Sequence, residues 1–330
     1  MTNMVYNVLL SELTREHHGM IEITTLGNLD IKINGVNVSD SFRKTTKLLQ
    51  LLNLFIINRS KPLPIKLIYE VIFGDDYDGN EYKALQNLIY RLRGVFAKHG
   101  ASDCIIYKNQ TYMLNPALDL RVDIYIMEDS YMQSLDPGLP PGETAALLRK
   151  AAGLYKGEYM LDFESRDIYL HSSTIRYKRL YVDVVCKLAD LYIESKDFNS
   201  AYVLCDRAIA IEPLEEPLYL RMICAMRSKG MDAQAIGLIE HYYDILDRKV
   251  GVKASGAIFD AYNELKHQAA YSRRDVDRFI EELKSSSPTS KALLLDFENF
   301  KEICKNGIRH SSDRDYLIAL ALIEINGKNP

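Results

Sequence analysis

At 330 residues the chain is longer than one typical domain, so we expect two or three domains. Hydrophobic residues make up 47% and charged residues 26%, which is typical of a soluble globular protein. The longest apolar run, residues 317–323, is far shorter than the ~20 residues of a membrane-spanning helix, so a membrane protein is excluded. The net charge of −4 gives no indication of nucleic-acid binding, but residues 21–115 carry 12 Lys and Arg against 9 Asp and Glu.

The five cysteines show no metal-binding pattern, because none forms a CxxC pair and none has a histidine at ligand spacing. We therefore expect no metal and no cofactor. An odd number of cysteines without a secretory signal indicates a reducing compartment, which predicts a cytoplasmic protein. Cys186, Cys205 and Cys224 fall on predicted helices, where we expect them to be small core residues.

The first ordered elements predicted after an N-terminal extension (residues 1–20) are antiparallel strands. Residues 21–38 alternate apolar and polar side chains, and Asn34-Gly35 is a strong signal for a two-residue hairpin turn. Residues 43–58 then read as an amphipathic helix. Its expected core positions are Leu48, Leu49, Leu51, Leu52, Phe55 and Ile56.

A second and a third helix follow, and then a hairpin. Pro64 suits the first turn of a helix that reaches Phe73. After the loop at 74–81, residues 81–98 form a helix, and residues 104–114 form a short hairpin. The expected core stripe of the third helix is Leu85, Leu88, Ile89, Leu92, Val95 and Phe96.

The opposite face of the third helix is rich in long hydrogen-bond donors and amides. It consists of Lys83, Gln86, Asn87 and Tyr90, with Arg91 and Arg93 at its edges. Such side chains on a rigid helix suit the major groove of DNA, although a charged helix face is also commonly just a solvated surface. Strands, three helices and a terminal hairpin in this order are typical of a winged helix, which favours DNA binding.

The acidic loop before the third helix does not predict a calcium site. An EF-hand loop needs a glycine after its first ligands, whereas here Gly79 precedes Asn80 and Glu81 occupies the glycine position. The acidic side chains instead lie near a helix N-terminus, which favours negative charge, or are presented to a protein partner.

The second half of the chain has a helical pattern with an internal repeat. A shift of 34 residues aligns Ala201 with Ala235 and Leu188 with Met222, and the turn at Lys196-Asp197 with the turn at Gly230-Met231. This period, with Pro213 closing the first copy, is that of a tetratricopeptide (TPR) repeat, although Ala208 maps onto Tyr242. Stacked helical hairpins of this kind leave a concave face for a partner.

Residues 284–291 read as a flexible linker, and residues 292–330 as a helix followed by a buried strand. A single strand needs partners. The tail is therefore packed on its neighbour, paired between chains, or the start of a domain.

Residues 21 to about 268 resemble a SARP-type bacterial transcriptional activator, in which a response-regulator-type winged helix precedes a bacterial transcriptional activator domain. The matching text includes LGNLDIKINGVNV, NLIYRLRGVF, LLRKAAGLYKGEY and the segment that begins PLEEPLYLRM. Two departures are Ile72-Phe73, where the family has Leu-Trp, and the wing at residues 109–112, where the family prefers glycine. The predicted fold is therefore an α+β winged helix (21–116), an all-α TPR-like domain (117–283), the linker, and a short α/β segment.

The resemblance implies a regulator that binds direct repeats near a promoter and recruits RNA polymerase. It implies a recognition helix at 81–98 and places Lys108 and Asn109 at the tip of the wing. The implied DNA contacts are Lys83, Gln86, Asn87, Tyr90, Arg91, Arg93, Lys108 and Asn109, with Arg43, Lys44 and Lys47 on the backbone. The implied polymerase contacts are Asp75, Asp76, Asp78 and Glu81. The repeat domain would serve a homodimer, an effector of unknown kind, or polymerase.

The tail resembles the opening of a degenerate diguanylate-cyclase (GGDEF-type) domain without the catalytic signature. No nucleophile motif, histidine triad or phosphate-binding loop is present elsewhere, so we do not predict an enzyme. Two further functions stay open: a TPR-like interaction adaptor whose winged helix no longer binds DNA, and a tail that senses a nucleotide.

Overall fold

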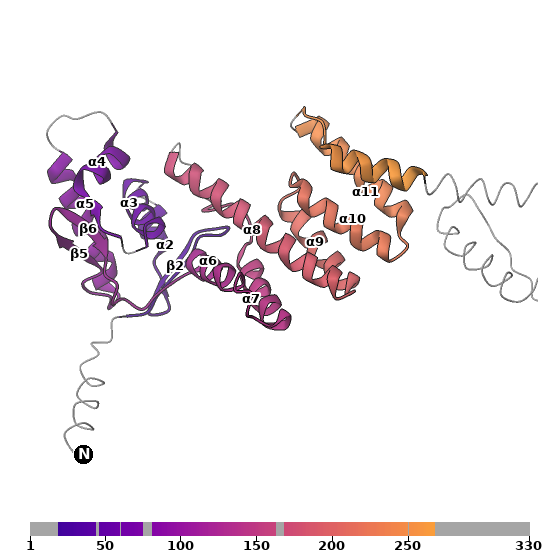
Figure 1. The fold of residues 1–330 in the computed structure, drawn as a ribbon. Coiled ribbons are helices and arrows are strands. Elements are labelled where there is room, and N and C mark those ends of the chain that lie inside the picture. Colours follow the sequence, from indigo (N-terminus) through magenta and orange to yellow (C-terminus); the bar gives the residue numbers. More distant parts are fainter. Residues whose placement is uncertain are drawn as a thin grey trace, which may run out of the picture. The chain divides into compact units, whose positions relative to one another are not determined.

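The computed structural model describes residues 19–43, 46–59, 61–74, 81–162, 168–249 and 251–267. These residues fall into two compact units that divide at residue 195, except that residues 207–212 belong to the first. Strands and helices make up the first unit and helices alone the second (Figure 1), which confirms the predicted fold class. The predicted N-terminal extension and the C-terminal linker and tail lie outside the described residues, apart from Gly19 and Met20.

A four-stranded sheet opens the first unit in the order β3-β2-β1-β7. Strands β1 (Ile21–Thr24), β2 (Asp30–Ile33) and β3 (Val36–Asn37) are antiparallel, as predicted. Asn34 and Gly35 both have positive φ, which is the geometry of the predicted tight turn. Strand β7 (Leu120–Val122) pairs parallel with β1 and lies in a region where we predicted only helices.

The predicted helix at 43–58 is found at Thr46–Ile57, and an additional helix that was not predicted precedes it. A short α2 (Ser39–Arg43) comes first, and the Asn37 side-chain oxygen accepts the N–H of Ser39 at 2.9 Å. Helix α3 (Thr46–Ile57) then buries all six predicted core positions. Residues 39–42, which lie between the predicted strands and the predicted helix, thus belong to a helix of their own.

Helix α4 (Ile65–Phe73) and helix α5 (Glu81–Lys98) complete the winged-helix core with a second sheet. This sheet has the order β4-β6-β5, with β4 (Leu63–Pro64), β6 (Thr111–Leu114) and β5 (Ile105–Lys108). Five of the six predicted core residues of α5 are buried, and Val95 is half-buried. The helix is thus held by its apolar stripe, which leaves the opposite face to solvent.

Helix α6 (Asp123–Gln133) follows β7 directly and is fixed to the first sheet by a buried carboxylate. Asp123 is 6% exposed and accepts the N–H groups of Thr25 (2.6 Å), Leu26 (2.7 Å) and Ile124 (2.8 Å) and the Thr25 hydroxyl (2.7 Å). Burial raises the pKa of Asp123, while the donated hydrogen bonds act in the opposite direction. Asp123 therefore joins elements almost 100 residues apart.

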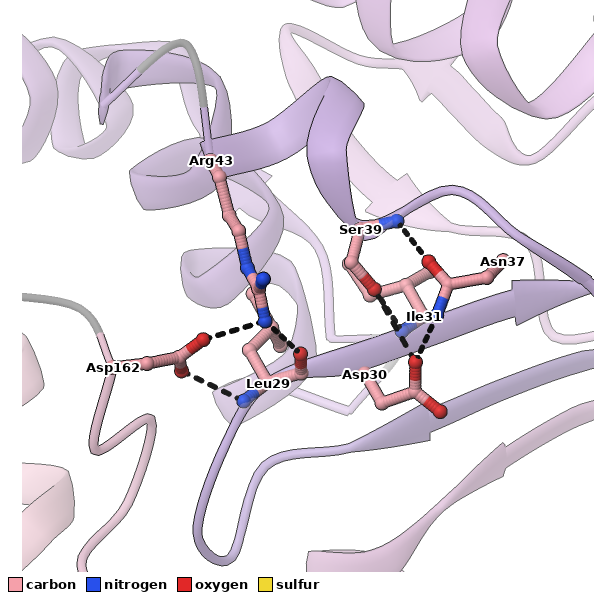
Figure 2. A network of polar contacts seen from close by, with 7 residues as sticks. All are labelled: Leu29, Asp30, Ile31, Asn37, Ser39, Arg43 and Asp162. Carbon is pink, nitrogen blue, oxygen red and sulfur yellow. Dashed lines mark hydrogen bonds and ion pairs between the residues drawn. The ribbon is translucent and has the colours of Figure 1, made fainter.

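Helix α7 (Pro141–Leu154) leads into residues 155–162, which pair with the loop at 25–29. Four backbone hydrogen bonds of 2.6–3.1 Å join the two segments. The Tyr159 hydroxyl donates to Asn53 of α3 at 2.7 Å, and Asp162 bonds Leu29 N and Arg43 (Figure 2). The winged helix and the first helices after it therefore form one body within the first unit.

The remaining helices are α8 (Ile168–Glu194), α9 (Phe198–Ile211), α10 (Glu216–Ser228), α11 (Asp232–Lys249) and a further helix over 256–267. Lys196 and Gly230, which the 34-residue shift aligns, both have positive φ at the turns between helices. Tyr242, in the place of a small residue, packs against Tyr219 with ring centroids 4.2 Å apart and the rings tilted by 34°. The larger side chain is thus accommodated by packing against a side chain of α10.

Two further observations concern the predicted core and the membrane. Cys186 and Cys205 are buried as predicted, but Cys224 is exposed, so its predicted place in the core is wrong. The buried residues of α10 lie on either side of it in sequence, and position 224 turns outward. None of the described helices is long and apolar enough to cross a membrane.

Candidate nucleic-acid interface

The exposed face of α5 carries the predicted contact residues. Lys83, Gln86, Asn87 and Tyr90 follow the i, i+3, i+4, i+7 spacing of one helix face, and all four are exposed. Tyr90 is 76% exposed, the largest value among the exposed large apolar and aromatic side chains that the structure describes. These four side chains form what we call the α5 reading face.

The charged side chains that follow Glu81 along α5 are all cationic. Residues 82–98 contain Lys83, Arg91, Arg93 and Lys98 but no Asp or Glu. All four cationic side chains are exposed. A helix face with cations and amides but no carboxylate matches the phosphates and base edges of a nucleic acid.

Arg93 connects α5 to the wing. Its Nη2 donates to the carbonyl oxygen of Ile105 in β5 at 2.8 Å. Burial raises the pKa of the thiol of Cys104, the residue before Ile105, to about 12, so this thiol stays neutral. Arg93, which we predicted as a DNA contact, thus also holds α5 against the hairpin.

The tip of the wing is a two-residue turn at Asn109-Gln110. Both residues have positive φ, +52° and +55°, as a type I′ turn requires. The Thr111 hydroxyl donates to the Lys108 carbonyl oxygen at 2.7 Å across the turn. Lys108 and Asn109 are both exposed at this tip, where a minor groove could be reached.

Replacing Gln110 by glycine should stabilise the wing. A side chain at positive φ is strained, and glycine is the residue that the second position of this turn favours. The change relieves left-handed strain of about 1–2 kcal/mol and costs roughly 0.5–1 kcal/mol through the greater freedom of glycine in the unfolded chain. We therefore expect Gln110→Gly to raise the free energy of unfolding by about 0.5 kcal/mol. Thermal unfolding followed by circular dichroism measures the change, with Asn109→Gly as a control that should gain less because asparagine tolerates positive φ. A lower melting temperature for Gln110→Gly would contradict the turn assignment.

Two exposed tyrosines, one on α5 and one on the wing, were not among the predicted contacts. Tyr82 is 55% exposed at the start of α5, and Tyr107 is 51% exposed on β5. Tyr107 packs against Tyr112 with ring centroids 4.8 Å apart. The position of Tyr82, four residues before Gln86, was available from the helical pattern, whereas the exposure of Tyr107 depends on how the wing packs.

The predicted backbone contacts near the first helix have different surroundings. Arg43 forms an ion pair with Asp162 (2.6 Å) and donates to the Leu29 carbonyl oxygen (3.1 Å), as Figure 2 shows. The ammonium of Lys47 is exposed and lies 4.4 Å from the centre of the Phe73 ring. Lys44 lies outside the described residues. Arg43 is therefore engaged within the protein, in a contact between residues 119 positions apart.

The structure does not describe the predicted polymerase contacts Asp75, Asp76 and Asp78. Glu81 is the first residue of α5, and its side chain also lies outside the description. Among the described residues, no group of three or more His, Cys, Asp or Glu side chains could hold a metal ion.

The second unit has a shallow groove of about 460 Å³ beside α10. It is lined by Leu220, Ile223, Cys224, Arg227, Ser228, Asp232 and Ala261. Both Nη atoms of Arg227 donate to the Glu264 carboxylate, at 2.8 and 2.9 Å. The one cation of this groove is thus neutralised, which does not favour an anionic ligand there.

Part of this chain matches the model of a known protein family, and the fold is similar to that of a solved structure. Residues 130–266 match the family model of the bacterial transcriptional activator domain. The solved structure of Mycobacterium tuberculosis EmbR in complex with a low-affinity phosphopeptide is similar, with a TM-score of 0.60 over 78% of this chain and 71% of that chain. The sequence identity is 15%, so this likeness shows the fold. No curated protein matches the chain in sequence.

Proposed function

We propose that the protein is a SARP-type transcriptional regulator that binds double-stranded DNA with α5 and the wing. The observation that carries the proposal is the exposed, carboxylate-free face of α5 beside a hairpin that presents Lys108 and Asn109. The bacterial transcriptional activator domain at 130–266 supports the regulatory role. An exposed helix of a winged-helix arrangement can enter a major groove, which supports the proposal.

The remaining predicted partners belong to the same proposal. A transcriptional activator must reach RNA polymerase, and the acidic segment that precedes α5 is the part of the winged helix that we propose for this contact. The helical repeats would mediate a homodimer or respond to an effector. A cytoplasmic location stays a prediction that accords with this role.

Fluorescence anisotropy of the full chain on a labelled random-sequence duplex tests the proposal. We expect binding at low salt, and a dissociation constant of about 1–100 μM at physiological salt, as for non-specific binding. An excess of unlabelled duplex should displace the labelled duplex and lower the anisotropy. If the chain binds no duplex even at low salt, the proposal fails and the adaptor function takes its place.

A further inference from the structure

We propose that the α5 reading face recognises A·T base pairs, with the carboxamide of Asn87 on adenine and the ring of Tyr90 on the methyl group of thymine. The inference rests on the proposed function, because it names the bases that the same surface reads. It assigns base contacts to the amide and the ring in the centre of the face, and phosphate contacts to the cations around them.

The amides are the groups that this face can offer to a base edge. Asn87 and Gln86 are exposed and make no hydrogen bond with the described part of the chain. A carboxamide has a donor and an acceptor side by side, which matches the N6 donor and N7 acceptor of adenine. Guanine presents two acceptors and is matched by arginine or lysine, but the cations lie at the end and edges of this face. One of them, Arg93, also donates to the Ile105 carbonyl oxygen.

The ring of Tyr90 supplies the second element. Tyr90 lies three residues after Asn87, so the two side chains are neighbours on the helix surface, about 5–6 Å apart at Cβ. Adjacent base pairs are about 3.4 Å apart, and both side chains can therefore reach neighbouring pairs. The methyl group of thymine is the apolar feature of the major-groove edge, and the exposed ring would be buried against it.

Competition with three alternating copolymers tests the inference on the full chain bound to the labelled random duplex. Poly(dI-dC) resembles G·C in the major groove but A·T in the minor groove, so it separates reading by α5 from reading by the wing. Poly(dA-dU) lacks only the thymine methyl. We expect poly(dA-dT) to compete about tenfold better than poly(dI-dC) and about fourfold better than poly(dA-dU).

Variants assign each preference to its residue. Asn87→Ala should abolish the preference over poly(dI-dC), while Asn199→Ala, a matched exposed amide on α9, should keep it. Tyr90→Ala should abolish the preference over poly(dA-dU), and Tyr90→Phe should keep it because the ring remains. Circular dichroism of each variant checks that the fold is intact.

The possible results separate the inference from the function. Equal competition by all three copolymers would overturn the inference and leave DNA binding intact. A loss for Tyr90→Phe as large as for Tyr90→Ala would also overturn it, since the hydroxyl would then be bound to phosphate. Absence of binding to the random duplex would overturn the proposed function itself.

Discussion

Asp123→Ala should lower the free energy of unfolding by about 3–5 kcal/mol, because it leaves buried donors without an acceptor. Thr25 and Leu26 have no exposed surface, and their N–H groups both donate to the Asp123 carboxylate. Water cannot replace the lost acceptor at these positions. Urea unfolding followed by circular dichroism measures the change, which is large against the 5–15 kcal/mol typical of a domain.

A nearby exposed aspartate provides the matched control for this variant. Asp119 lies just before β7, and its side chain is 55% exposed, 3.8 Å from Arg121. Asp119→Ala should change the free energy of unfolding by less than about 0.5 kcal/mol. Equal effects of the two variants would show that the Asp123 hydrogen bonds do not hold α6 to the sheet.

Reversing two charges of the interface together should nearly abolish DNA binding. Lys83 on α5 and Lys108 on the wing are exposed, and neither forms an ion pair with the described residues. Each phosphate contact contributes roughly eightfold to affinity at about 0.1 M salt, so losing two costs roughly sixtyfold before repulsion is added. We expect Lys83→Glu with Lys108→Glu to weaken binding on the order of a hundredfold in fluorescence anisotropy.

The same charge change in the second unit controls for net charge. Lys249 and Lys253 are exposed there. Lys249→Glu with Lys253→Glu alters the total charge equally but should weaken binding less than about threefold, because it removes no contact and acts only through screened long-range charge. A similar loss for both double variants would contradict the assignment of the interface to α5 and the wing.

Local patterns were sufficient to predict most elements of the winged helix. The 3.6-residue period of α5 separates Leu85 and Leu92 in the core from Asn87 and Tyr90 on the surface, and the structure confirms this division. The Asn34-Gly35 turn has a strong sequence signature. The wing turn has a weak one, since Gln110 replaces the usual glycine, and its place in the order of elements made it predictable.

Contacts between distant segments were not predictable from one sequence. Strand β7 has only three residues, too few for a periodic pattern, and its partner β1 lies about 100 residues earlier. The engagement of Arg43 by Asp162 likewise depends on how residues 155–162 return to the sheet. We predicted Arg43 as a DNA contact because an ion-pair partner 119 positions away leaves no local signal in the sequence.

The salt dependence of DNA binding tests the central claim most directly. If α5 and the wing contact phosphates through Lys83, Lys108 and at least one arginine, log K should fall linearly with log salt, with a slope of about −2.7 or steeper. The measurement is fluorescence anisotropy of the full chain on the random-sequence duplex across a salt series. A slope near zero, or no binding at the lowest salt, would contradict a DNA-binding role for this surface.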